Sequence, residues 1–248
     1  MKNKIVALFL AAILVFPNVA LARTYHVPII MYHKVVDICP STSKKDYAFY
    51  ITPKLFEAEM RYLRNHGYKT IFMKDAAAAI AAGKNISGNS VVLTFDDGTS
   101  DFPETVLPVL KKYNLHATIY VNPGFNGKND RMTWEDIMAL GHSDLVEVAA
   151  HTMDHVNLTT VSLDEARSQI EDSKTVIEHL IDKPVVSFAY PFGGHNADLA
   201  NMVQSLGFTS GVISEQIGEE SSSTQFILPR LRIGDTNHIE TFIKLLRG

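Results

Sequence analysis

Short apolar runs alternate with helical patterns along most of this 248-residue chain. Residues 27–32, 90–95 and 145–150 have the length and composition of buried strands. Helix-start signals lie between such runs, and the clearest is Thr52-Pro53, a capping residue followed by proline. Strands that alternate with helices favour a mostly parallel sheet with helices outside it. Seven or eight such units predict an α/β barrel in a single domain.

An open, doubly wound sheet is the alternative architecture for this alternation. Open sheets that bind dinucleotides carry a glycine-rich loop after a strand. No such loop follows any predicted strand, and residues 124–127 do not fit the G-x-G-x-x-G pattern. We therefore predict the barrel, whose functional side chains should follow the carboxyl ends of its strands.

The first 22 residues have the pattern of a signal peptide. Lys2 and Lys4 form a basic start, residues 5–16 form an apolar core, and Ala20-Leu21-Ala22 matches a cleavage site. A transmembrane anchor is the alternative, but the apolar core is shorter than the roughly 20 residues that span a bilayer. We expect residues 1–22 to be removed. Residues 23–248 would then form a periplasmic or secreted domain with no stable membrane anchor.

Charge and cysteine content exclude some classes of partner and bond. The chain has 23 Lys and Arg residues against 27 Asp and Glu residues, for a formal net charge of −4. No basic stripe appears, so nucleic acid is not an expected partner. Cys39 is the only cysteine, so the chain has no internal disulfide.

Ionisable side chains stand directly after two predicted strands. Thr94-Phe95-Asp96-Asp97-Gly98 closes one run, and His151-Thr152-Met153-Asp154-His155 follows another. Taken alone, Asp-Asp-Gly is typical of a turn, and His-x-x-x-His brings its rings together most readily on a helix. Because both motifs lie at strand ends, they predict a divalent-metal site and one further carboxylate that is not needed as a ligand. That combination is the minimum for metal-assisted hydrolysis.

A third cluster, Ala189-Tyr190-Pro191-Phe192-Gly193-Gly194-His195-Asn196, also follows an apolar strand. Proline and glycine favour a tight loop there, whose backbone N–H groups could stabilise an oxyanion. A plain strand-to-helix turn is the alternative.

Together these motifs resemble those of the polysaccharide deacetylases of the NodB-homology type, carbohydrate esterase family four. The shared motifs, in order, are Thr94-Phe95-Asp96-Asp97-Gly98, Met132-Thr133-Trp134, His151-x-x-x-His155 and Tyr190-Pro191-Phe192-Gly193. The resemblance implies a distorted (β/α)7-type barrel that removes N-acetyl groups from the N-acetylhexosamine units of a glycan. It also implies one divalent metal ion, usually zinc, and an Asp-His-His ligand set accepts cobalt or nickel as well.

The resemblance assigns roles to individual residues. It makes Asp96 the base that takes a proton from the attacking water. It places an oxyanion-stabilising N–H at Phe192 and makes Tyr190, in the same motif, a further candidate for contact with the oxyanion or the substrate. Trp134 either lines an apolar wall near the acetyl group or packs against the start of its helix. The implied metal ligands are Asp97, His151 and His155.

Two departures from the family pattern leave roles to fill. The family usually has an arginine that orients the base two residues before the proline of the third motif, where this chain has Ala189. Alternation along a strand places Arg230 and Arg232 on one face. Either could replace that arginine, and pairing with surface acids is the alternative.

The second departure is the absence of the C-terminal Leu-x-His that supplies the acid in many members. Met31-Tyr32-His33 resembles the corresponding tripeptide of a circularly permuted branch that deacetylates poly-N-acetylglucosamine. We therefore expect His33 to be the general acid, with a strand-end histidine satisfied by backbone as the alternative. His195 and His238 are the rival histidines.

The leading functional hypothesis is an exported, metal-dependent N-deacetylase whose partner is an acetylated glycan. An O-acetyl esterase and a carbohydrate-binding protein without catalysis are the alternatives. Peptidoglycan, poly-N-acetylglucosamine, lipopolysaccharide sugars and chitin-like oligomers are all compatible substrates. We expect the loops at residues 37–49 and 123–131 to select among them.

Overall fold

The computed structural model describes residues 27–38, 43, 46–84, 86, 88–214, 220–234 and 238–247. The expected signal peptide and Cys39 lie outside these residues. Within the described part of the chain, no helix has both the length and the apolar character that crossing a membrane requires.

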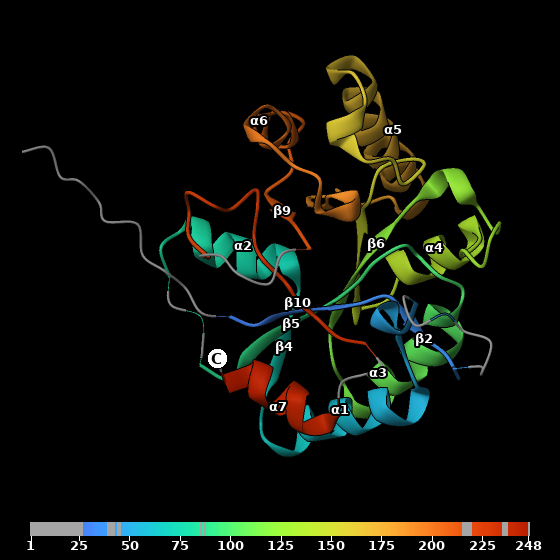
Figure 1. Cartoon of the computed structure of the whole chain (residues 1–248), viewed down its shortest axis with the longest axis vertical. Coiled ribbons are helices and arrows are strands. Elements are labelled where there is room, and N and C mark those ends of the chain that lie inside the picture. The colour runs from blue at the N-terminus through green and yellow to red at the C-terminus, as the bar shows by residue number, and fades with distance from the viewer. Residues whose placement is uncertain are drawn as a thin grey trace, which may run out of the picture.

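Parallel strands form the centre of the molecule (Figure 1). The main sheet has eight strands, with β4 paired to β5 and the others in the order β10-β1-β5-β6-β7-β8-β9. Every pairing in this sheet is parallel. The strands are β1 (Ile29–Tyr32), β4 (Lys69–Ile71), β5 (Ser90–Phe95), β6 (Ala117–Val121), β7 (Val146–Ala150), β8 (Ser187–Ala189), β9 (Ser210–Val212) and β10 (Leu231–Arg232).

The segment that leads into β10 joins the two ends of this sheet. On one side, the Leu228 N–H donates to the Gly211 carbonyl at 2.8 Å. On the other side, the Ile233 N–H donates to the Met31 carbonyl at 2.9 Å. The sheet therefore curls into a distorted (β/α)7 barrel, which confirms the predicted fold.

Helices other than α2 cover the outside of the sheet, and α1, α3 and α7 lie side by side (Figure 1). The helices are α1 (Pro53–Asn65), α2 (Met73–Ala81), α3 (Leu107–Tyr113), α4 (Trp134–Gly141), α5 (Leu163–Ile181), α6 (Ala197–Ser205) and α7 (Ile239–Arg247). Thr52 caps α1 as predicted, because its side chain accepts a hydrogen bond from the Leu55 N–H. A capping box between Thr133 and Asp136 begins α4.

A π-helical turn, Phe102–Val106, precedes α3 and leads directly into it. Pro108 has no N–H to donate to the fourth residue before it, so a regular α-helical ladder cannot run through this point. The short strands β2 (Lys34–Val35) and β3 (Tyr50–Ile51) pair with each other, separate from the barrel.

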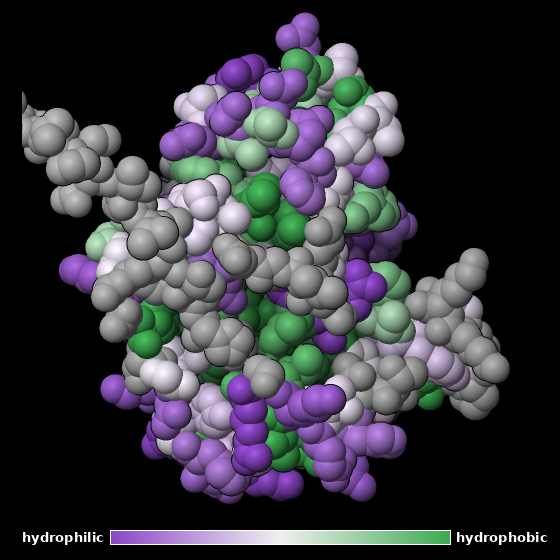
Figure 2. Space-filling view, turned by 60° about the vertical axis from the view of Figure 1, so that its left-hand side comes forward, coloured by the Kyte–Doolittle hydropathy of each residue, from purple (hydrophilic) through white to green (hydrophobic). Residues whose placement is uncertain are grey.

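Two hydrophobic cores lie on the two faces of the sheet. Val92 and Ala149 belong to the inner core together with α2, whereas their neighbours Leu93 and Val148 belong to the outer core under the other helices. This alternation follows from the two-residue period of a strand. Outside these cores the surface in Figure 2 is mainly hydrophilic at both ends of the face shown.

Candidate active site

The inner face of the barrel continues past the carboxyl ends of its strands into one cavity. The cavity has a volume of about 510 Å³. Because side chains alternate along a strand, a residue two positions beyond an inner-core residue faces the same way. His151 stands in this relation to Ala149, and Asp96 stands four positions beyond Val92. The predicted residues that line the cavity are His33, Asp96, Asp97, His151, His155, Phe192 and Arg232.

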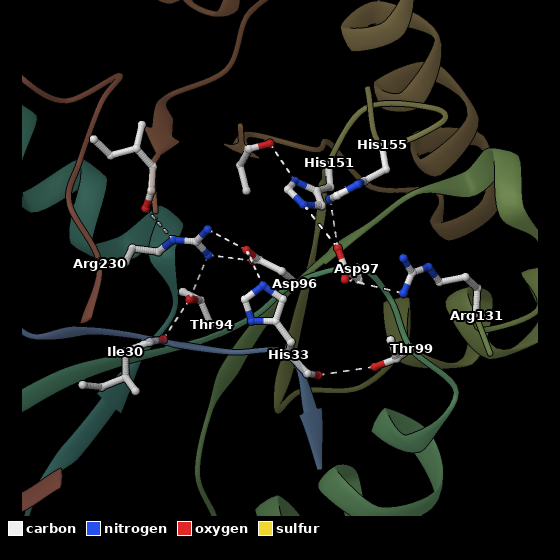
Figure 3. A network of polar contacts seen from close by, with 12 residues as sticks. Ile30, His33, Thr94, Asp96, Asp97, Thr99, Arg131, His151, His155 and Arg230 are labelled. Atoms are coloured by element: carbon white, nitrogen blue, oxygen red, sulfur yellow. Dashed lines mark hydrogen bonds and ion pairs between the residues drawn. The ribbon is translucent and has the colours of Figure 1, made fainter. Parts of the chain in front are cut away.

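Asp96 is held by a bidentate pair with Arg230 (Figure 3). Both guanidinium–carboxylate distances are 2.6 Å, and both side chains are buried. Arg230 also donates to the Thr94 hydroxyl and to the Ile213 carbonyl, which holds the guanidinium in place. Burial alone would raise the pKa of Asp96, but the charge and hydrogen bonds of Arg230, together with the nearby His151 and His33, lower it overall. The structure thus brings Arg230, and not Arg232, to the carboxylate.

Asp97, His151 and His155 place three ligand atoms within 4.8 Å of one another. The Asp97 Oδ1 lies 3.2 Å from the His155 Nε2 and 3.6 Å from the His151 Nε2. Burial would raise the pKa of Asp97, but the two histidines lower it well below its usual range. Two imidazoles and a carboxylate are a donor set that suits zinc and leaves further coordination positions open. These residues therefore fit the divalent ion predicted from the sequence.

A contact with the backbone of the neighbouring strand fixes the orientation of the His151 ring. Its Nδ1 lies 2.8 Å from the Ala189 carbonyl on the neighbouring β8. A hydrogen bond donated from Nδ1 leaves Nε2 unprotonated and directed at Asp97, as a metal ligand requires.

Left-handed backbone conformations concentrate around the cavity. Asp97, Thr152, His155 and Phe192 have φ values of 75°, 65°, 53° and 58° although none is glycine. Such conformations cost of the order of 1–3 kcal/mol each and are typical of functional sites. Asn122 stabilises one of these turns, because its side-chain amide donates to the carbonyls of His151 and Thr152.

His33 follows β1 and lies beside Asp96, with its Nε2 4.0 Å from the Asp96 Oδ2. Burial lowers the pKa of His33 to about 4, although the neighbouring carboxylates act to raise it. The two rival histidines do not line the cavity. His195 lies with its Nδ1 2.8 Å from the Gly193 carbonyl, and His238 is exposed.

Comparison with known proteins agrees with this geometry. The family model described as polysaccharide deacetylase matches residues 83–211, more than half of the chain. The chain belongs to the polysaccharide deacetylase family. This confirms the resemblance drawn from the motifs.

Relatives of this polysaccharide deacetylase domain include YxkH of Bacillus subtilis, which is 28% identical over 206 residues, covering 83% of this chain and 71% of the relative. The poly-beta-1,6-N-acetyl-D-glucosamine N-deacetylase of Staphylococcus aureus is 25% identical over 208 residues, covering 79% and 71%. The solved structure of the Streptococcus pyogenes deacetylase PplD in complex with acetate superposes with a TM-score of 0.83 at 24% identity, covering 91% of this chain and 100% of that one. That structural likeness shows the shared fold.

The third deacetylase motif divides between the cavity and the outer core. Phe192 is 68% exposed at the cavity, with its ring 4.7 Å from that of His155. Tyr190 is buried in the outer core against Phe188, because it stands one position beyond inward-facing Ala189. The side chain of Tyr190 therefore does not reach the cavity.

Trp134 also lies outside the cavity, at the first position of α4. Its side chain is 43% exposed and lines a separate hollow with Val176 and Leu180. The Trp134 Nε1–H donates to the Pro123 carbonyl at 3.4 Å. Of the two roles considered for Trp134, the geometry supports packing at the helix start.

Several residues of the cavity were not singled out as site residues by sequence. Phe49, Asn129 and Arg131 belong to the two loops expected to select the substrate, so the loops were a partial signal for them. Asn122, which supports the His151 turn from outside the cavity, stands directly after an apolar strand, and a polar residue at that position is a signal that sequence reasoning could have used. The remaining lining residues are Lys34, Tyr50 and Ser214.

Proposed function

We propose that this chain is an exported, metal-dependent hydrolase that removes N-acetyl groups from the N-acetylhexosamine units of a glycan. The observation that carries the proposal is the meeting of two sets in one cavity, Asp96 with Arg230 and Asp97 with its two histidines. Membership of the polysaccharide deacetylase family supports it. The name of the Staphylococcus aureus relative makes an N-acetylglucosamine polymer a reasonable first substrate to test.

Asp97, His151 and His155 would hold the divalent ion, which supplies Lewis-acid chemistry toward water and the acetyl carbonyl when it is bound. Asp96 acts as the general base. Arg230 keeps its carboxylate ionised and aims it at the cavity, so that it can accept a proton from the attacking water. Arg230 is a positioning residue, since Asp96 and neighbouring backbone and hydroxyl groups are its hydrogen-bond partners.

Collapse of the tetrahedral adduct breaks the C–N bond, and the departing amine needs a proton. His33 supplies it in this proposal. With a pKa of about 4, His33 is neutral at pH 7 before substrate enters. The proton that Asp96 takes from water is available 4.0 Å away, and its passage to His33 and on to the amine nitrogen completes the cycle. The products are acetate and the free amino sugar.

The main test is acetate release from N-acetylglucosamine oligomers by the purified chain without residues 1–22. We expect release in the presence of zinc, loss with a chelator, and recovery when zinc, cobalt or nickel is restored. The His155→Ala variant should lose bound metal by elemental analysis. A protein that binds the oligomers without releasing acetate under any metal would contradict the hydrolase. Release from O-acetyl esters alone would make it an esterase.

A further inference from the structure

Around the cavity, arginine and lysine side chains outnumber the carboxylates of the Asp96-Asp97 motif. Each carboxylate of the Asp96-Asp97 motif has an arginine beside it, Arg230 at 2.6 Å and Arg131 at 3.6 Å. Two further cations, Lys34 and Arg232, line the same cavity. Because the whole chain has a formal net charge of −4, this excess is a local feature of the cavity.

Arg232 has no anionic partner among the described residues, and its buried Nε has no hydrogen-bond partner there. The guanidinium carbon lies 5.2 Å from the centroid of the Phe49 ring. Phe49 in turn packs edge-on against His33, with ring centroids 4.9 Å apart. A cation–ring contact supports the guanidinium plane and leaves its N–H donors available. The Arg232 guanidinium is therefore available to bind an anion next to His33, the proposed general acid.

A second cation–aromatic pair lies next to the first. The Lys34 Nζ is 5.7 Å from the centroid of the Tyr50 ring, and the two residues are partners in the β2–β3 pairing. Lys34 also pairs with Asp130 at 3.3 Å, but that carboxylate is 79% exposed, and ion pairs in water contribute little. Since Phe49 and Tyr50 are consecutive, one short segment supports both cations.

Gly234 allows this segment to pack against the end of β10. A Cβ at Gly234 would lie 2.6 Å from the Tyr47 carbonyl oxygen and 2.8 Å from backbone atoms of Ala48. Only glycine fits so close an approach of two backbones. Gly234 is two residues after Arg232, so this contact seats Phe49 against Arg232. The placement of the cation is therefore built into the fold.

We infer that Arg232 and Lys34 bind an anionic group of the glycan, a carboxylate or a phosphate, on or next to the sugar whose acetamido group reaches Asp96. The inference rests on the proposed deacetylase function and narrows its substrate class. A planar guanidinium with free donors suits a carboxylate or a phosphate in a bidentate contact, and a lysine adds a point charge. A neutral sugar would leave Arg232 without an anionic partner and Lys34 with only the exposed Asp130.

The test compares three N-acetylglucosamine disaccharides that differ only in the second sugar, which is neutral, carries a carboxylate or carries a phosphate. We expect kcat/KM for acetate release to be about ten- to a hundredfold higher for a charged disaccharide, the scale of a hydrogen-bonded charge contact. The preference should shrink between about 0.05 and 0.5 M salt. The charged compound with the higher kcat/KM identifies the source of the anion.

Arg232→Gln should remove most of this preference, so that kcat/KM for the charged disaccharide falls toward that for the neutral one. Arg232→Lys, which keeps the charge without the fork, should retain part of the preference. The matched control is Arg64→Gln, at an exposed arginine of α1, which should behave as the native chain. Should Arg232→Gln not fold, Lys34→Gln is the second variant and should reduce the same preference.

Equal kcat/KM for the three disaccharides overturns the inference and leaves the deacetylase function standing. An Arg232→Gln variant that lowers kcat/KM equally for neutral and charged substrates also overturns the inference. Absence of acetate from every substrate refutes the deacetylase function instead. Calorimetry with the matching disaccharides that carry a hydroxyl in place of the acetamido group then decides the inference. The inference requires that the native chain bind the charged analogues more tightly than the Arg232→Gln variant does.

Discussion

Two carboxylates face the inside of the barrel at opposite ends, and their surroundings give them opposite properties. Asp96, at the carboxyl ends of the strands, is paired with Arg230 and has a lowered pKa. Glu147, near the start of β7, accepts hydrogen bonds only from neutral donors: the hydroxyls of Ser187 and Thr118 and the Lys74 N–H.

Burial raises the pKa of Glu147, and these neutral donors reduce the shift without reversing it. Depth alone therefore does not decide whether a carboxylate in this barrel is ionised. The difference lies in the nearby cations: Asp96 has the buried Arg230 beside it, whereas Glu147, within the described part of the chain, has only the weaker influence of the exposed Lys74 side chain. The barrel thus has a charged end, which we propose to be the reactive end, and a hydrogen-bonded, structural end.

The largest expected effect separates these two carboxylates by activity. Asp96→Asn keeps the shape but removes the proton acceptor, so kcat on an N-acetyl substrate should fall by about 10²–10⁴. The matched Glu147→Gln should change kcat by less than about twofold, because Glu147 has no contact with the cavity. Elemental analysis should find normal metal in both variants. Loss of metal together with activity in Asp96→Asn would make Asp96 a ligand.

Arg230→Gln tests whether the cation makes the difference. Removing one partner of a buried ion pair costs about 3–5 kcal/mol in the free energy of unfolding, which denaturant titration would measure. Burial would then dominate at Asp96 and raise its pKa, so the rising limb of activity against pH should move to higher pH. An unchanged pH profile with reduced stability would limit Arg230 to a structural role.

His33→Ala asks whether the reactive end also supplies an acid. An amine leaves poorly without a proton, whereas a phenolate leaves unaided. Hydrolysis of an N-acetyl sugar should therefore fall by about 10² or more, and hydrolysis of a phenyl acetate should fall much less. The ratio of the two rates is the measurement, with metal content as the control. Equal losses on both substrates would remove His33 from the role of acid.

The smallest effect concerns Glu59, a carboxylate buried in the outer core of the barrel. Its one hydrogen bond comes from the Tyr32 hydroxyl at 2.8 Å, and burial raises its pKa from 4.5 to about 8. The folded state therefore holds a proton that the unfolded state releases between about pH 4.5 and 8. Stability from this group is full below that range and is lost as pH rises through it.

Glu59→Gln should therefore unfold at higher denaturant than the native chain near pH 8.5, by at least about 1 kcal/mol, and show little difference near pH 5. Thermal or denaturant unfolding at the two pH values checks this. A native chain whose stability does not fall between these pH values would show that Glu59 is ionised in the fold.

The sequence predicted what depends on local patterns. Apolar runs and capping residues located the strands and helices, and the two-residue period correctly placed Arg230 and Arg232 on one face, which the structure shows to be the inner one. The roles assigned to Asp96, Asp97 and the histidines stay predictions until the variants are measured, although the structure brings all of them together.

Other features depend on contacts between distant segments or on unusual backbone conformations. Arg131 reaches Asp97, and Phe49 reaches His33, only because separate loops meet over the barrel mouth. The outward direction of Tyr190 was available from the period of the strand, since Ala189 before it faces inward. Motif membership had favoured the cavity for Tyr190.

The closing segment of the barrel has a consequence for the order of folding. Arg230 pairs with Asp96 across 134 positions of the chain, and the residues around it hydrogen-bond to both ends of the sheet. Contacts so distant in sequence form slowly, because a long loop must close first. The three proposed metal ligands, by contrast, lie within residues 97–155. We therefore expect a newly made chain to bring these proposed ligands together first and to become active only when its last strand docks.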